Sequence, residues 1–228
     1  MATRGRTIAW CCAALLIVRV AGKCGAYASN IIDGMRWAAG LSVSGVTLNP
    51  AATTAKVINL SFGGSGACGA AYQAAIDEVT AAGSLVVVAA GNDYGAVSRP
   101  GNCAGVLTVG AVRHDGLKAN YSNFGAQIGL MASGGSDAQI FNGALPTIHY
   151  PGLPMWSMSN TGTTTPVSDT YKSRVGTSFA APLVAGTASL MLSVNPALTP
   201  QELMTRLKAT ARPHIRLTSL YDVVDNVR

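Results

Sequence analysis

The chain has 228 residues, of which 49% are apolar and only 11% charged, a composition that excludes a disordered chain and suits one α/β domain with a large core. The net charge is +6, but the basic residues are scattered and not interleaved with aromatic ones, so nucleic-acid binding is not expected. The five cysteines show no C-x-x-C or Cys/His spacing, and there is no clustered run of aspartates, so no metal site is predicted.

The first apolar run, Ile8–Val20, is too short to span a membrane and is open to two interpretations. It has the basic start and apolar core of a signal peptide, yet it also has the composition of a buried strand. Arg19 interrupts the end of the run, and no clear A-x-A cleavage site follows it. These two features favour a buried strand at Leu15–Val20.

Strand-like and helix-like segments alternate along the rest of the chain. Strands are predicted at Val57–Ser61, Leu85–Ala90 and Val106–Val109. Helices are predicted at Ser29–Ala39, with Ser29 or Asn30 as its cap, at Ala70–Ala82, at Ala180–Val194, and after the cap Thr199, with Pro200 and Glu202 in the first turn. Residues 133–170 are rich in Gly, Ser, Thr, Asn and Pro, so they predict loops and a hairpin. The alternation predicts a parallel sheet with helices on both faces, and the apolar Ala180–Val194 predicts a central buried helix.

One glycine-rich loop has the context of a nucleotide site. Gly64, Gly66 and Gly69 form a G-x-G-x-x-G loop between a predicted strand and helix, and Asp93 follows the next strand. That arrangement is the fingerprint of dinucleotide binding, and alone it would indicate an NAD-binding oxidoreductase. A chain with 26 glycines also contains such loops without any ligand.

Three longer strings occur in a fixed order. VINLSFGG starts at Val57, VVVAAGN ends at Asn92, and GTSFAAPLVAG runs from Gly176 to Gly186. In that order they resemble the substrate-binding strand, the oxyanion-hole strand and the nucleophile motif of subtilisin-like serine proteases, peptidase family S8. The shorter pieces YSNFG at Tyr121–Gly125 and NPALT at Asn195–Thr199 are similar to the same family. Three ordered motifs are more specific than one glycine loop, so the nucleotide interpretation becomes a minor alternative.

The resemblance implies a three-layer α/β subtilisin-like fold and cleavage of protein or peptide substrates without a cofactor. Ser178 would be the nucleophile at a helix N-terminus, where free N–H groups favour a developing oxyanion, and Asn92 would donate to that oxyanion. The remaining residues implied at the site bind the substrate. They are Ser61, Phe62 and Gly63, which would pair with the substrate backbone, and Ala90 and Gly91, which would line the pocket before the scissile bond.

The aspartate and histidine motifs of the family, D-[ST]-G and G-H-G-T-H, do not occur in the sequence. The three histidines, His114, His149 and His214, lie in loop-like or terminal stretches with the wrong neighbours. The string LLIVRVAGKCG from Leu15 resembles the strand that follows the family's histidine helix. We therefore expect an N-terminally truncated fold, with residues 1–14 unassigned and 15–228 a partial subtilase domain. Its protease activity should be impaired, and a non-catalytic peptide-binding remnant is the alternative.

The family resemblance also implies secretion, which bears on the cysteines. Cys68 and Cys103 both follow the carboxyl ends of strands that should be neighbours in a parallel sheet. In an exported protein we therefore expect them to form a disulfide, which requires Cα atoms within about 7 Å. Cys24 is expected to be unpaired, because its partner would lie in the N-terminal part of the family's fold that is missing here.

Overall fold

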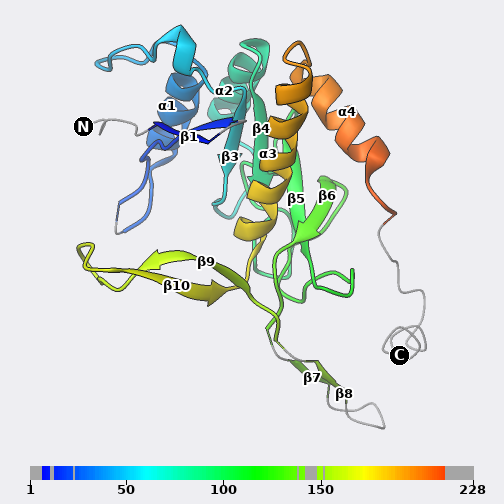
Figure 1. Cartoon of the computed structure of the whole chain (residues 1–228). Coiled ribbons are helices and arrows are strands. Elements are labelled where there is room, and N and C mark those ends of the chain that lie inside the picture. Colours follow the sequence, from blue (N-terminus) through cyan, green and yellow to red (C-terminus); the bar gives the residue numbers. More distant parts are fainter. Residues whose placement is uncertain are drawn as a thin grey trace.

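A four-stranded parallel sheet is the centre of the computed structural model, which describes residues 7–10, 13–22, 24–137, 139–141, 148–150 and 152–213. Its strand order is β3-β4-β5-β6 (Figure 1), with β3 at Val57–Leu60, β4 at Leu85–Ala89, β5 at Leu107–Val112 and β6 at Ile128–Ser133. The first three strands and the parallel pairing confirm the predictions from the sequence. β6 was not predicted, because none of its residues is β-branched except Ile128.

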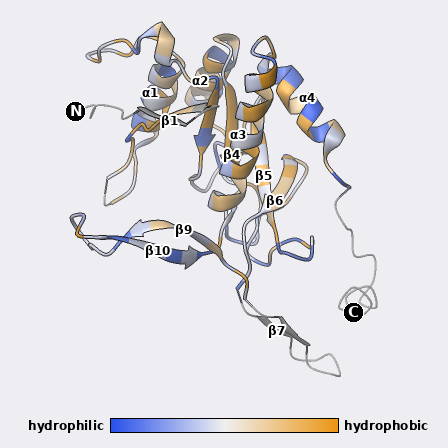
Figure 2. Ribbon diagram, in the orientation of Figure 1, coloured by the Kyte–Doolittle hydropathy of each residue, from blue (hydrophilic) through white to orange (hydrophobic). Residues whose placement is uncertain are grey.

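Helices cover both faces of this sheet and make a three-layer α/β fold. On one face lie α1 (Ala28–Ala38) and α2 (Ala70–Ala81), and on the other lie α3 (Thr177–Val194) and α4 (Pro200–Thr210) (Figure 1). A short 3₁₀ helix at Ala51–Thr53 precedes β3. Apolar residues gather on the central strands and on α3 (Figure 2), as expected where two helical layers enclose a parallel sheet.

Strand β4 separates two apolar clusters and contributes to both. Leu85, Val87 and Ala89 point into the cluster under α3 and α4, whereas Val86 and Val88 point into the cluster under α1 and α2. All five residues are buried, which is the pattern of a strand covered on both faces. Burial of each large apolar side chain contributes roughly 1.5–3 kcal/mol.

Helix α3 differs from the prediction of a fully buried helix. It packs against the sheet strands β3, β4, β5 and β6, but only one side of it is covered. Leu183 is 46% exposed, Leu190 57% and Val194 87%. Among the described residues α3 is the one helix long and apolar enough to cross a bilayer, but its packing on the sheet is that of a core helix.

The N-terminal segment also departs from the prediction. Ala13–Leu16 (β2) pairs antiparallel with Thr7–Trp10 (β1), and residues 17–20 are not a strand. Val18 and Val20 pack against the cluster under α1, whereas Leu15 and Ile17 are 60% and 54% exposed. The predicted strand at Leu15–Val20 is therefore wrong in its bounds, because β2 ends at Leu16, and in its burial, because Leu15 and Ile17 are exposed.

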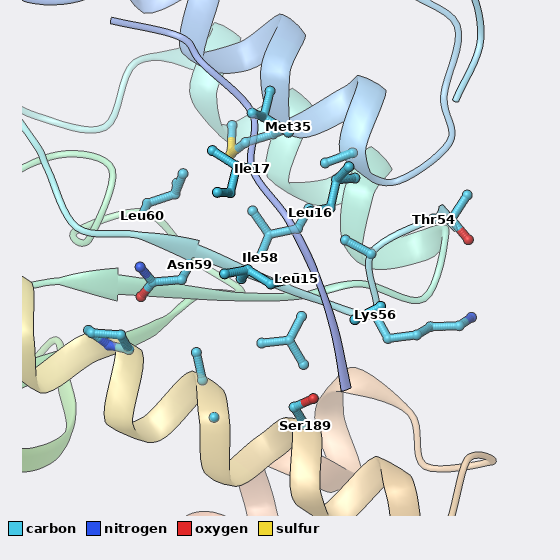
Figure 3. Close-up of a pocket in the computed structure, with 18 of the residues that line it drawn as sticks. Leu15, Leu16, Ile17, Met35, Thr54, Lys56, Ile58, Asn59, Leu60 and Ser189 are labelled. Carbon is cyan, nitrogen blue, oxygen red and sulfur yellow. The ribbon is translucent and has the colours of Figure 1, made fainter. Parts of the chain in front are cut away.

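An apolar groove of about 1180 Å³ opens beside this segment, between α1, the free edge of β3, and α3. Figure 3 shows Leu15–Ile17 lying across β3, with Met35 of α1 on one side and Ser189 of α3 on the other. We call this surface the β3 groove. Its lining includes the exposed Leu183 and Leu190 of α3, so the groove joins the open face of that helix.

Two antiparallel hairpins lie in the region predicted to hold loops and a hairpin. One consists of β7 (Gln139–Phe141) and β8 (Ile148–Tyr150), and the other of β9 (Met155–Asn160) and β10 (Asp169–Arg174). The second hairpin extends below the body of the molecule and leads directly into α3 (Figure 1).

The two predicted helix caps differ in outcome. α1 begins after Tyr27, with no side-chain cap from Ser29 or Asn30, so that detail of the prediction is wrong. At α4 the Thr199 hydroxyl accepts a bond from the Glu202 N–H at 3.2 Å, and the Glu202 carboxylate accepts from the Thr199 N–H at 2.8 Å. This capping box confirms the prediction for Thr199, Pro200 and Glu202.

Replacing Thr199 by alanine is expected to lower the free energy of unfolding by about 1 kcal/mol at neutral pH, because one helix cap is lost. The N–H of Thr199, together with its hydroxyl, holds the pKa of the Glu202 carboxyl below its ordinary value of 4.5. A lowered folded-state pKa gives stability that is present above pH 4.5 and is lost as the pH falls through the folded-state pKa. The variant keeps the backbone N–H at position 199 but loses the hydroxyl bond to the Glu202 carboxylate, so the difference between the two urea midpoints should narrow on acidification without closing. The prediction would be contradicted if the difference in urea midpoint were as large in acid as at neutral pH. It would also be contradicted if the control Thr210→Ala lost as much stability as Thr199→Ala.

Candidate active site

Ser178 lies in the first turn of α3, where the chain passes from an extended segment into the helix. Its hydroxyl donates to the carbonyl oxygen of Ser61 at 2.9 Å, and the Ser61 hydroxyl donates back to the Ser178 carbonyl at 2.9 Å. Gly176, just before the helix, has φ of +151°, a conformation that favours glycine. This reciprocal pair joins the predicted nucleophile to the predicted substrate-binding strand, although 117 residues separate them.

Asn92 lies in the loop after β4 and faces the residue before Ser178. Its side-chain oxygen accepts bonds from the N–H of Thr177 at 2.8 Å and from the Thr177 hydroxyl at 2.9 Å. The Thr177 hydroxyl itself accepts from the Gly91 N–H at 3.2 Å. Because the oxygen of the Asn92 amide is occupied, its NH₂ group is the part that is left to donate to a ligand.

Thr177 was not among the site residues predicted from the sequence. It is completely buried, and its N–H, at the start of α3, has no partner within the helix. The contact with Asn92 satisfies that group and orients the amide at the same time. The available signal was its place directly before the serine in GTSFAAP.

Tyr121, from the YSNFG string, supports the segment that leads to Ser178. Its hydroxyl lies 2.7 Å from the carbonyl oxygen of Gly134 and 2.8 Å from that of Gly135, and it donates to this pair. Gly134 in turn accepts from the Gly176 N–H at 2.9 Å. Burial raises the pKa of Tyr121 to about 12, so the phenol keeps its proton and remains a donor.

The five predicted substrate-binding residues have different environments. Phe62 and Gly63 are exposed, but the carbonyl of Ser61 is already occupied by the Ser178 hydroxyl. Gly91 is half-buried, whereas Ala90 is fully buried. The exposed part of the predicted binding strand is therefore Phe62–Gly63, and a substrate that pairs at Ser61 has to displace the serine hydroxyl.

No histidine or carboxylate contacts the Ser178 hydroxyl among the side chains that the structure describes; its acceptor there is a backbone carbonyl. His114 lies in the turn after β5. The side chain of His149 and the whole of His214 lie outside the described residues. Within the described part of the chain there is also no group of three or more metal-ligating side chains. The described site thus contains a hydroxyl and an amide donor but no base.

The structure joins Cys68 to Cys103 by a disulfide, the pair expected from the sequence, with Cα atoms 5.0 Å apart. Cys24 is exposed and has no disulfide partner within the described part of the chain.

The glycine-rich loop beside the disulfide lies next to Arg99. Gly64 pairs with Arg99 through two backbone bonds of 2.9 and 3.0 Å. The Arg99 guanidinium lies 3.7 Å from the position of a Cβ at Gly64 and 3.9 Å from one at Gly66. Gly69 precedes α2, and Asp93 follows Asn92 in the loop after β4.

Residues 8–225 match the family described as the subtilase family, Peptidase S8. The chain belongs to the subtilase family. It is 46% identical over 198 residues to an extracellular protease of Xanthomonas campestris pv. campestris, covering 86% of this chain and 31% of that protein. It is 40% identical over 212 residues to an extracellular basic protease of Dichelobacter nodosus, covering 90% and 32%.

A solved subtilase-like structure supports the same assignment. It comes from the proteases of Pseudoalteromonas arctica PAMC 21717, with a TM-score of 0.77 and 43% identity, and covers 86% of this chain and 55% of that one. The chain thus spans about a third of the two curated extracellular proteases and just over half of this structure.

Proposed function

We propose that this subtilase chain carries the nucleophile, the oxyanion donor and the substrate-binding strand of a serine endopeptidase. In this proposal the Ser178 oxygen attacks the scissile carbonyl of a protein substrate, the C–N bond breaks, and the hydroxyl proton passes to the departing amine, which leaves an acyl-enzyme. One observation carries the proposal: Thr177 occupies the oxygen of the Asn92 amide, so the NH₂ group is oriented as a donor beside the start of α3.

The local electrostatics favour this chemistry. The N-terminus of α3 is the positive end of the helix dipole, which stabilises a developing negative charge. An oxyanion donor of this kind typically contributes 10²–10³ in rate, about 3–4 kcal/mol. Phe62 and Gly63, which follow the end of β3, are exposed, so a substrate can bind beside them in an extended conformation.

The chain by itself should be a poor enzyme, because a serine hydroxyl is a weak nucleophile without a base. Where triad members are removed, the oxyanion hole and substrate binding leave a residual enhancement on the order of 10³–10⁴ over water. A second candidate function is non-catalytic peptide binding. It is favoured because the acceptor of the Ser178 hydroxyl among the described residues is a backbone carbonyl, that of Ser61, and not a base.

The partners in this proposal are protein or peptide substrates, and the location is extracellular. Two relatives are named as extracellular proteases. Secretion also agrees with the Cys68–Cys103 disulfide, because disulfides persist in oxidising compartments.

A fluorophosphonate probe tests the proposal on the purified full chain. Slow labelling that disappears in Ser178→Ala is expected, while the control Ser193→Ala, an exposed serine on the same helix, should label as the parent does. Labelling that persists in Ser178→Ala would contradict the nucleophile assignment. A folded chain that does not label, but binds an extended peptide less tightly after Phe62→Ala, would favour the peptide-binding function instead.

A further inference from the structure

The YSNFG string contains a buried polar residue that the proposed chemistry does not use. Asn123 is 1% exposed, and its side chain contacts the loop that follows β4. We propose that Asn123 is a positioning residue for Asn92: it fixes the backbone on both sides of the oxyanion donor without contacting the reacting atoms. The proposal rests on the function proposed above, because it takes Asn92 as the donor.

The Asn123 side chain both accepts hydrogen bonds from N–H groups of this loop and donates to its carbonyl groups. Its oxygen accepts from the N–H of Asp93 at 2.8 Å and from the N–H of Gly95 at 3.1 Å. Its NH₂ group donates to the carbonyls of Ala90 at 3.1 Å and Ala96 at 2.9 Å. One amide therefore closes a loop of seven residues on itself, and a buried amide with so many partners is costly to replace.

These bonds flank Asn92 on both sides. Asp93, directly after it, is held by the Asn123 side chain, and the carbonyl of Gly91, directly before it, accepts from the Asn123 backbone N–H at 3.0 Å. With both neighbours attached to one buried residue, the Cα of Asn92 has little freedom to move. The restriction keeps the Asn92 amide oxygen within hydrogen-bonding distance of Thr177.

Gly91 provides the space that Asn123 needs. A Cβ at position 91 would lie 2.2 Å from the Asn123 amide nitrogen and 2.7 Å from the Ser98 hydroxyl oxygen. The φ of Gly91 is +108°, which also disfavours any side chain there. Gly91 is therefore required by the Asn123 amide, as well as by its predicted place in the substrate pocket.

Hydrogen exchange at Thr177 tests the proposal without relying on activity. The N–H of Thr177 is bonded to Asn92 and has no bond to Asn123, so its exchange rate reports the position of Asn92. In Asn123→Ala, we expect Thr177 to exchange about tenfold faster or more relative to β4 amides such as Val87. The matched control is Asn49→Ala. Asn49 is 2% exposed and bonds to Ala38 and Thr53, away from the site.

A purely structural role would accelerate exchange equally in both variants through global destabilisation. Equal acceleration of Thr177 in Asn123→Ala and Asn49→Ala would therefore overturn the proposal. If Asn123→Ala does not fold, the milder Asn123→Ser is measured against Asn49→Ser, with the same expected contrast at Thr177.

The two proposals fail separately. If Ser178 reacts with fluorophosphonate, Asn123→Ala should lower the limiting labelling rate about tenfold with an unchanged half-saturating concentration, since only the donor is displaced. An unchanged limiting rate would overturn the positioning role while the nucleophile assignment stands. If Ser178 does not react, selective exchange at Thr177 still supports the positioning role, and the proposed hydrolysis fails alone.

Discussion

Removing the Cys68–Cys103 disulfide is expected to lower the free energy of unfolding by about 4 kcal/mol. The bridge closes a loop with a sequence separation of 35 residues, and the entropy lost by the unfolded chain on closing such a loop accounts for this value. The loop includes α2 and β4, so the loss affects the centre of the fold rather than a terminus.

Urea unfolding of the oxidised protein and of the double variant Cys68→Ser/Cys103→Ser measures this effect. Cys24→Ser is the matched control, because Cys24 is exposed and unpaired and its replacement should leave the midpoint unchanged. Coincident midpoints for the double variant and this control would show that the bridge does not stabilise the fold.

Under the proposed function, replacing Asn92 by alanine should slow the reaction of Ser178 with fluorophosphonate by 10²–10³. The reason is the loss of the NH₂ group that faces a developing oxyanion. Second-order labelling rates, normalised to the fraction of folded protein, measure the effect.

The variant Asn92→Asp separates the donor from the structural contact. The aspartate keeps an oxygen that can accept from the N–H and hydroxyl of Thr177, but it has no N–H to offer. It should therefore label about as slowly as Asn92→Ala while Thr177 keeps its protection from exchange. Labelling at the parent rate in Asn92→Asp would show that another group stabilises the oxyanion.

Local signals in the sequence were sufficient for much of the fold. The apolar run Leu85–Ala90 predicted β4, and Thr199 with Glu202 predicted the start of α4, because each signal involves neighbours in the chain. Motif order likewise predicted that Ser178 and Asn92 belong to one site. The structure brings Asn92 onto Thr177, next to that serine.

The features that sequence reasoning missed depend on distant partners. Leu15–Val20 has the composition of a buried strand, but whether it is buried depends on what pairs with it and covers it, and here β1 is the partner of Ala13–Leu16. Asn123 and Thr177 act through contacts with residues 25 to 86 positions away, which no local pattern encodes. The bond between Ser61 and Ser178 is of the same kind.

The position of β4 between the two apolar clusters affects the cooperativity of unfolding. Two separate cores can unfold independently, but here the same strands line both clusters: β4 contributes to each, and β3 contributes Val57 to one and Ile58 and Leu60 to the other. Val87 is buried in one cluster and Val88 in the other. Unfolding of either cluster therefore exposes a face of β4 and destabilises the other cluster. Asn92 is three residues beyond the end of β4, and α3 packs on one face of the sheet. We therefore expect unfolding to be a single cooperative transition. The geometry around Ser178 should persist until the whole sheet unfolds.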